Sequence, residues 1–176
     1  MRSLGIVVLT LASSSLMAPL AVAQSLGAGT RETPADSPDA MFVQQAGRDV
    51  AAEMEFSRLA AQRAQSAQVR RYAEDMLQEH ERSNRELELI ANHENIAPPH
   101  DIDDEQAQVR AQLSVLHGDE FDRAYLQAMR ADHEKLAQLL RSSQATVSTP
   151  ELRRYIATNL PVVQEHLRMA GSIRRE

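Results

Sequence analysis

Residues Tyr72 to Glu81 read Tyr-Ala-Glu-Asp-Met-Leu-Gln-Glu-His-Glu, and residues Tyr125 to Glu134 read Tyr-Leu-Gln-Ala-Met-Arg-Ala-Asp-His-Glu. Both copies have the order Tyr, three residues, Met, two residues, an acid, His and Glu. In each copy the His lies on the apolar stripe of a helical pattern, in which buried residues recur every three or four positions. The repeat therefore predicts two long helices that each bury a histidine, His80 and His133.

The sequence on either side of the repeat carries the same helical pattern. Small and apolar residues recur three and four positions apart in the segment before it, with Glu53 in the middle of the stripe. After the second copy, Thr149-Pro150-Glu151 supplies a capping residue, a proline at the first helical position and an acid. Pro161 is expected to kink this last helix. The expected long helices are Met41 to about Ser66, Gln68 to Asn92, Asp119 to Ser143, and Thr149 to Ile173.

A long connection joins the second and third of these helices. Pro98-Pro99 prevents the second helix from continuing, a short helix is expected from about Asp104 to His117, and Gly118 ends it. Such a connection can run the length of a bundle. No segment shows the alternation typical of a strand. The pattern predicts an all-α fold, a four-helix bundle with a short extra helix in the connection between the second and third long helices.

The first residues predict export. Met1-Arg2-Ser3 precede an apolar run from Leu4 to Met17, and Ala21-Val22-Ala23 has the small-x-small pattern of a signal-peptide cleavage site. We expect a signal peptide over residues 1–23, cleaved after Ala23, a flexible leader over residues 24–40 and the bundle domain over residues 41–173. Because the chain has no cysteine, export brings no disulfide, thiolate metal site or lipid-modified cysteine. The expected location is the periplasm.

The overall charge and the aromatic content exclude some partners. A net charge of −6 offers no attraction to a phosphate backbone or to an anionic membrane surface. Three Phe, three Tyr and no Trp provide no platform on which bases could stack. We therefore expect no nucleic-acid binding, and no integral membrane segment once the signal peptide is removed. A homo-oligomer or an envelope protein partner stays open.

Each expected long helix places one titratable residue in the middle of its buried stripe: Glu53, His80, His133 and His166. At about 1.5 Å per residue, all four lie near the mid-height of the bundle. A buried polar group without a partner costs about 1–3 kcal/mol, and a divalent cation would remove that cost. The four residues are therefore candidate ligands of a divalent metal ion. One carboxylate and three imidazoles suit zinc, iron, manganese or copper, and the sequence does not choose among them.

A second interpretation needs no metal. Glu53 could accept hydrogen bonds from two of the histidines, giving a buried polar layer that fixes the register of the helices. Under either interpretation the acids next to the histidines, Glu79, Asp132 and Glu165, point about 100° away and are expected to be solvated or to support the site from outside. Further candidates for supporting hydrogen bonds are Ser57, Asn84 and Asn159.

Several short motifs resemble a known family in their order and spacing: Glu53 with Leu59-Ala60, Glu79-His80, Phe121-Asp122-Arg123-Ala124-Tyr125 with Asp132-His133, and Leu160-Pro161 with His166-Leu167. The chain resembles the bacterial exported family called domain of unknown function 4142, often labelled predicted outer-membrane protein. The resemblance covers about Met41 to Ala170. It implies a ferritin-like bundle and an envelope location, and it implies no particular reaction.

The di-iron signature of ferritin-like enzymes is absent. That signature needs a Glu three residues before a His on two helices, whereas Leu77, Arg130 and Val163 stand at those positions. Ferroxidase and di-iron oxygenase activities are therefore not expected.

Three functions remain open from the sequence. The first is a periplasmic bundle that binds a metal ion in its core, in metal handling or envelope stress. The second is a non-catalytic envelope protein that acts through its surface or by self-association, with the same four residues forming a polar layer. The third is a mononuclear metal enzyme. Whether the protein is an enzyme is not decided, because no nucleophile or substrate pocket can be identified.

Overall fold

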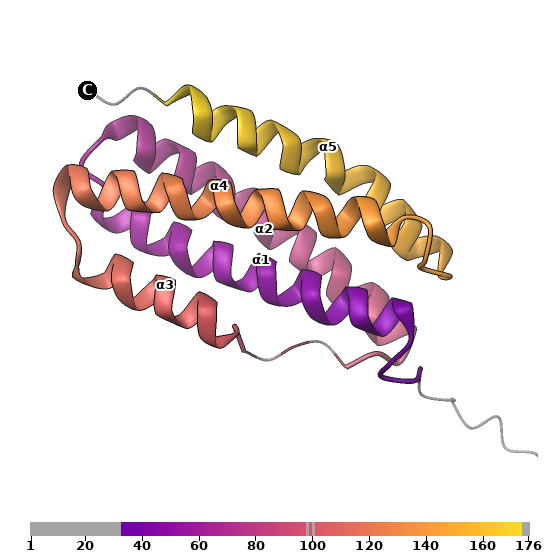
Figure 1. The fold of residues 1–176 in the computed structure, drawn as a ribbon. Helices are drawn as coiled ribbons and strands as arrows, with labels where there is room; N and C mark the ends of the chain where they lie inside the picture. Colours follow the sequence, from indigo (N-terminus) through magenta and orange to yellow (C-terminus); the bar gives the residue numbers. More distant parts are fainter. Residues whose placement is uncertain (1–32, 98, 100, 174–176) are drawn as a thin grey trace, which may run out of the picture.

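The computed structural model describes residues 33–97, 99 and 101–173, and this part of the chain is helical without any strand. The all-α prediction is thus confirmed, and four long helices form a bundle (Figure 1). The signal peptide and most of the expected leader lie outside the described residues and remain predictions. The helices are α1 (Pro38–Arg63), α2 (Ala67–His93), α3 (Asp104–Val115), α4 (Gly118–Ser143) and α5 (Pro150–Ser172).

Helix α1 begins at Pro38, three residues before the expected start at Met41. The Ser37 hydroxyl accepts a hydrogen bond from the amide of Ala40, and Pro38 occupies the first turn. Proline loses no hydrogen bond in the first turn, so it starts this helix instead of belonging to the leader. Helix α1 therefore starts within the stretch expected to be leader, directly after Ser37.

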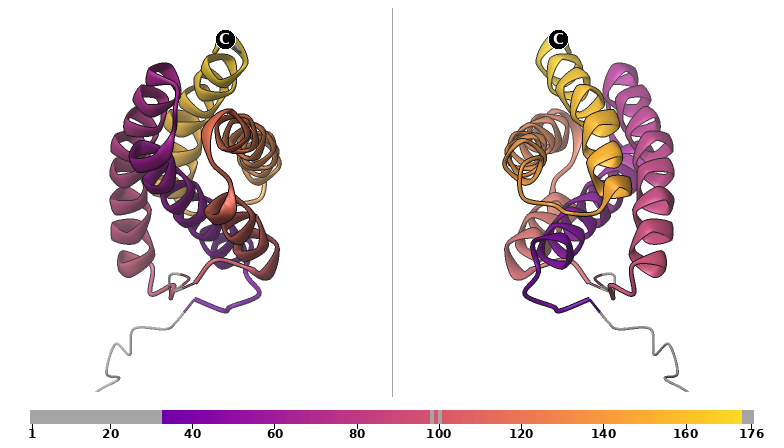
Figure 2. Two further views of the ribbon diagram at one scale, coloured as in Figure 1. Left: turned by 90° about the vertical axis from the view of Figure 1, so that its left-hand side faces the viewer. Right: turned by 90° about the vertical axis from the view of Figure 1, so that its right-hand side faces the viewer.

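The start of α4 is held beside the turn between α1 and α2. The Asp122 carboxylate accepts hydrogen bonds from the backbone amides of Gln65 at 3.0 Å and Ser66 at 2.7 Å. Helix α4 thus begins where α1 ends, and the two run antiparallel. The connection that contains α3 must run back along the bundle to reach this end, as Figures 1 and 2 show. One long crossover between two helical hairpins is the ferritin-like arrangement.

The opposite end of the bundle has an equivalent contact. The Asp39 carboxylate at the start of α1 accepts hydrogen bonds from the backbone amides of Ser148 at 2.6 Å and Thr149 at 3.0 Å, which precede α5. The Thr149 hydroxyl also donates to Asp39, at 2.5 Å, and makes no capping bond to its own helix. Thr149 therefore sits at the predicted helix start, but its side chain joins two hairpins instead of capping α5.

The connection before α3 passes close to α1 at Gly47. A Cβ atom on Gly47 would lie 2.6 Å from Cγ of Pro99. A larger residue would clash with the Pro99 ring, so only glycine leaves room for the connection at this point. Near its middle, α5 continues through Pro161 without interruption. No helix within the described residues is long and apolar enough to cross a membrane.

The apolar core is divided into two clusters along the bundle axis. One cluster includes Val43 and Leu140, and the other includes Phe56 and Met129. Between them the buried positions of the long helices are polar. The division places a layer of polar side chains across the middle of an otherwise apolar interior.

Candidate metal centre

The four predicted residues meet in this layer. Helix α1 supplies Glu53, α2 supplies His80, α4 supplies His133 and α5 supplies His166, each from the stripe that the helix turns inward. Their exposed fractions are 0% for Glu53 and His133, 3% for His80 and 4% for His166. We call these four side chains the polar layer.

The three imidazoles pack edge to face. Their ring centroids are 5.1 to 5.3 Å apart, and one ring nitrogen from each histidine lies within 4.8 Å of those of the other two. Nε2 of His133 is 3.1 Å from Nδ1 of His166. Two nitrogens bonded to one tetrahedral zinc ion at about 2.0–2.1 Å lie about 3.3 Å apart. The separation of this pair is therefore close to that of two ligands of a common ion.

The orientation of His133 is fixed by its own helix. Nδ1 of His133 is 2.7 Å from the carbonyl oxygen of Met129, one turn earlier in α4. A carbonyl oxygen only accepts hydrogen bonds, so the proton of the neutral ring is on Nδ1 and Nε2 carries a lone pair. This arrangement, in which one ring nitrogen donates to the backbone and the other is free, is usual for metal-binding histidines.

Glu53 lies against two of the imidazoles. Its Oε1 atom is 3.1 Å from Nδ1 of His133, and its Oε2 atom is 3.2 Å from Nε2 of His80. Despite these short distances, the angles at these atoms do not fit a hydrogen bond. Both carboxylate oxygens of Glu53 and Nε2 of His80 therefore have no hydrogen-bond partner within the described part of the chain. Three buried polar atoms are thus close to one another without being satisfied.

Burial keeps the polar layer uncharged when no ion is present. Desolvation, together with the negative charges of Asp132 and Asp49, raises the pKa of Glu53 well above its ordinary value. Desolvation and the neighbouring histidines lower the pKa of His80 well below its ordinary value. Desolvation likewise lowers the pKa of His133 to about 3 and that of His166 to about 4. The imidazoles are therefore neutral, the form that binds a metal.

The acids that precede the histidines are outside the layer, as expected from the helical rotation. Glu79 forms an ion pair with Arg82, and Glu165 forms one with Arg168, both near the surface. Asp132 is half-buried, and burial raises its pKa to about 6.

The three predicted supporting residues have different surroundings. The Ser57 hydroxyl is 3.0 Å from the Tyr125 hydroxyl, one turn from the layer. The Asn84 amide donates to Glu88 on the surface and does not face the site. The Asn159 amide nitrogen donates to the Tyr155 carbonyl oxygen at 2.9 Å and lies beside two of the histidines.

A buried polar network that the sequence pattern did not predict lies next to the layer. Asp49 lies one turn before Glu53 and is 7% exposed. Its Oδ1 atom accepts hydrogen bonds from Gln45 at 2.9 Å and from Gln106 of α3 at 3.0 Å. Burial raises the pKa of Asp49 to about 6. The signal was an acid four residues before Glu53, but its partner on α3 could not be foreseen from spacing.

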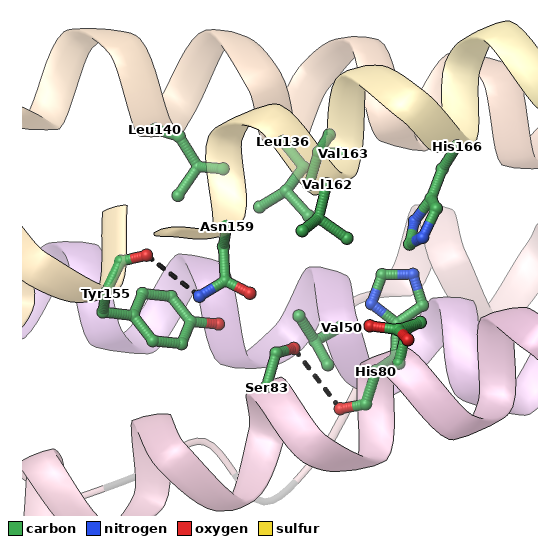
Figure 3. Close-up of a pocket in the computed structure, with 11 residues that line it drawn as sticks. Val50, His80, Ser83, Leu136, Leu140, Tyr155, Asn159, Val162, Val163 and His166 are labelled. Carbon is green, nitrogen blue, oxygen red and sulfur yellow. Dashed lines mark hydrogen bonds between the residues drawn. The ribbon is translucent and has the colours of Figure 1, made fainter. Parts of the chain in front are cut away.

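A narrow cleft between α2 and α5 reaches the polar layer (Figure 3). Its volume is about 10 Å³, close to the space that one water molecule needs. His80 and His166 lie at one end, and Ser83, Tyr155 and Asn159 line the rest together with apolar side chains. We call this space the α2/α5 cleft.

These features define a class of protein: a ferritin-like four-helix bundle whose long helices each contribute one histidine or glutamate to a buried polar layer. A family model described as Domain of unknown function (DUF4142) matches residues 24–173. The chain belongs to this family, as the sequence resemblance implied. No curated protein matches the chain.

Solved structures support the fold. A DUF305 fragment from Deinococcus radiodurans matches with a TM-score of 0.69 and 20% identity, covering 80% of this chain and 95% of that chain. A DUF305 protein from Streptomyces coelicolor matches with a TM-score of 0.68 and 18% identity, covering 78% and 90%. At this identity the likeness concerns the fold alone.

Proposed function

We propose that this chain is an exported protein that binds one divalent metal ion in the core of its bundle. The ligands are His80, His133 and His166 together with Glu53. The observation that carries the proposal is the unsatisfied state of the layer: both oxygens of Glu53 and Nε2 of His80 are buried without a hydrogen-bond partner in the described residues.

The free energy that such unsatisfied polar atoms cost the folded protein favours a layer that holds an ion over a layer without one. Each buried polar atom without a partner costs about 1–3 kcal/mol. A divalent cation would accept the lone pairs of the three imidazoles and balance the charge of an ionised Glu53. The hydrogen bond from His133 to Met129 already orients one of these lone pairs toward His166.

The donor set narrows the identity of the ion. Calcium and magnesium prefer oxygen ligands, and three nitrogens with one oxygen do not suit them. Imidazole with carboxylate suits zinc, iron, manganese or copper. The cellular role that we propose is metal handling or the response to envelope stress. Export is proposed from the signal-peptide pattern of residues 1–23, and the family match begins after it, at residue 24.

One observation favours the alternative of a metal-free structural layer in a non-catalytic envelope protein. The 3.1 Å contact between Nε2 of His133 and Nδ1 of His166 is also the distance of a hydrogen bond between two imidazoles. In that case one of these two nitrogens would carry a proton and the lone pair of the other would accept it in a hydrogen bond, so that neither nitrogen could bind an ion.

The deciding experiment measures metal content and stability together. Protein purified from the periplasm without added metal is analysed for all transition elements, and its melting temperature is measured with chelator and with added zinc, iron, manganese or copper. We expect about one ion per chain and a melting temperature that falls with chelator and recovers with the matching metal. Sub-stoichiometric metal throughout, with a melting temperature indifferent to every addition, would contradict the proposal.

A pair of variants assigns the ion to the layer. His80→Leu is expected to lose bound metal, whereas a structural layer predicts a change in stability alone. His93→Leu is the matched control, because His93 lies near the end of the same helix with its side chain 78% exposed. The control should keep both metal and stability.

A further inference from the structure

We propose that the metal ion has one coordination position that no protein atom fills and that faces the α2/α5 cleft. This position binds a water molecule, which a small anion can displace. This inference rests on the proposed function, because it assigns an exchangeable ligand to the same ion. It differs from the proposed function in what it predicts: a closed site would bind metal equally well and exchange nothing.

The α2/α5 cleft ends at two of the proposed metal ligands. Two of the proposed ligands, His80 and His166, form its inner end, whereas Glu53 and His133 do not line it. The cleft therefore approaches the proposed ion from the side on which His80 and His166 lie. Apart from Glu79, which is paired with Arg82, no further carboxylate or imidazole of the described residues lines it. Figure 3 shows the two imidazoles at one end of this space.

The cleft also has polar groups that could hold a water molecule. Its volume of about 10 Å³ is close to the minimum that a cavity needs to hold one water molecule, and a water needs two to four polar partners to be held in a buried site. Nδ2 of Asn159 donates to the Tyr155 carbonyl oxygen, and the side-chain oxygen of Asn159 is a group that could accept a hydrogen bond from a water in the cleft. Figure 3 shows Asn159 projecting into the cleft between Tyr155 and the two histidines. Ser83 adds a hydroxyl on the opposite helix.

The cleft also has a route to solvent. Glu79, Asn159 and Val162 line it and are each partly exposed, whereas the histidines at its inner end are buried. A small molecule entering between these residues would reach His80 and His166 without displacing a core side chain. The narrow volume limits the ligand to a water, a hydroxide or an anion of a few atoms bound end-on.

Cobalt and azide test the inference. Co²⁺ can replace the natural ion, and its absorption bands depend on the number and kind of its ligands. We expect the full chain to bind a single Co²⁺ ion and azide to change the bands saturably as it displaces water from the open position. Bands that azide leaves unchanged in a Co²⁺-loaded protein would overturn the inference while leaving the metal site intact. No stoichiometric Co²⁺ binding would instead overturn both proposals.

Two tryptophan variants locate the position. Val162→Trp places a large side chain at the rim of the cleft and should weaken azide binding at least about tenfold with Co²⁺ binding retained. Leu167→Trp is the control, since Leu167 is partly exposed on the same helix and does not line the cleft. An azide response in Val162→Trp equal to that of the control would place the exchangeable ligand elsewhere and overturn the assignment.

Discussion

At Glu53 the protonation state depends on what occupies the polar layer. Burial raises the pKa of this carboxyl well above its ordinary value, so the ion-free protein holds it protonated over a wider pH range than an exposed glutamate. A cation favours the ionised form. Metal binding must therefore release a proton from Glu53, and the affinity for metal should rise with pH.

The proton release can be measured by calorimetry of metal binding in buffers with different ionisation enthalpies. Glu53→Gln removes the titrating group, and we expect about one proton fewer to be released per ion, with an affinity lower by about 10- to 100-fold. Glu55→Gln is the control, because Glu55 lies on the same helix in a surface ion pair with Arg110. Equal proton release in both variants would show that Glu53 is not ionised by the metal.

Asp49 gives the stability of the protein a pH dependence of its own. Burial raises its pKa from 3.8 to about 6, so the folded state binds this proton more tightly than the unfolded chain does. The favourable contribution is complete below about pH 4 and is lost as the pH rises through 6. Asp49→Asn can still accept the bonds from Gln45 and Gln106, and should stabilise the protein by about 1–3 kcal/mol at pH 7.

Denaturant unfolding at a series of pH values checks this prediction. The difference in unfolding free energy between Asp49→Asn and the wild type should shrink as the pH falls from 7 to 4. Asp75→Asn is the control, because Asp75 is exposed on α2. A difference that stays constant across this range would mean that the Asp49 carboxyl does not titrate as its burial indicates.

Among the helices, the two turns are held by acids from the opposite hairpin. Asp122 of α4 accepts hydrogen bonds from two backbone amides of the α1/α2 turn. Asp39 of α1 accepts hydrogen bonds from two backbone amides of the α4/α5 turn. Removing either acid leaves partly buried amides without partners. Asp122→Ala should therefore lower the free energy of unfolding by about 1–3 kcal/mol without changing metal binding.

The neighbouring acid provides the control for Asp122. Asp119 accepts a bond only from the exposed side chain of Gln65 among the described residues, at 2.6 Å. Asp119→Ala should cost well under 1 kcal/mol. If both variants lose the same stability in urea titrations, the amides of the turn do not depend on Asp122.

The helices themselves were largely predictable because their buried stripes are regular. The second helix was expected over Gln68 to Asn92 and is found over Ala67–His93. The start of α1 was missed because Pro38 was taken for a leader residue, although Ser37 before it is a helix cap. The contacts of Asp39 and Asp122 could not be predicted, since each joins residues that are distant in the sequence and meet only in the crossover topology.

Across the whole molecule, the sequence indicated that one side chain from each long helix would lie at mid-height, and the structure places all four in one layer. Helical rise alone gives this height, because each residue lies near the middle of its helix. The orientation of each imidazole, by contrast, does not follow from helical rise. The bond from His133 to Met129 and the α2/α5 cleft depend on side-chain packing, which no spacing in the sequence specifies.

The position of the layer between two apolar clusters leads to a last prediction about stability. In the ion-free protein the layer divides the core and contains unsatisfied polar atoms, so it weakens the bundle that it crosses. Replacing a buried polar or ionic group with apolar residues of similar volume is often neutral or stabilising by about 1–4 kcal/mol. The combined variant Glu53→Met, His80→Leu, His133→Leu and His166→Leu should therefore keep the helical fold, bind no metal and unfold at higher denaturant concentration than the chelated wild type. His80→Leu alone removes a neighbour of Glu53 and should be less stable than the chelated wild type. A combined variant that fails to fold, or that is less stable than the single one, would show that the layer is needed for the structure itself, as the metal-free alternative requires.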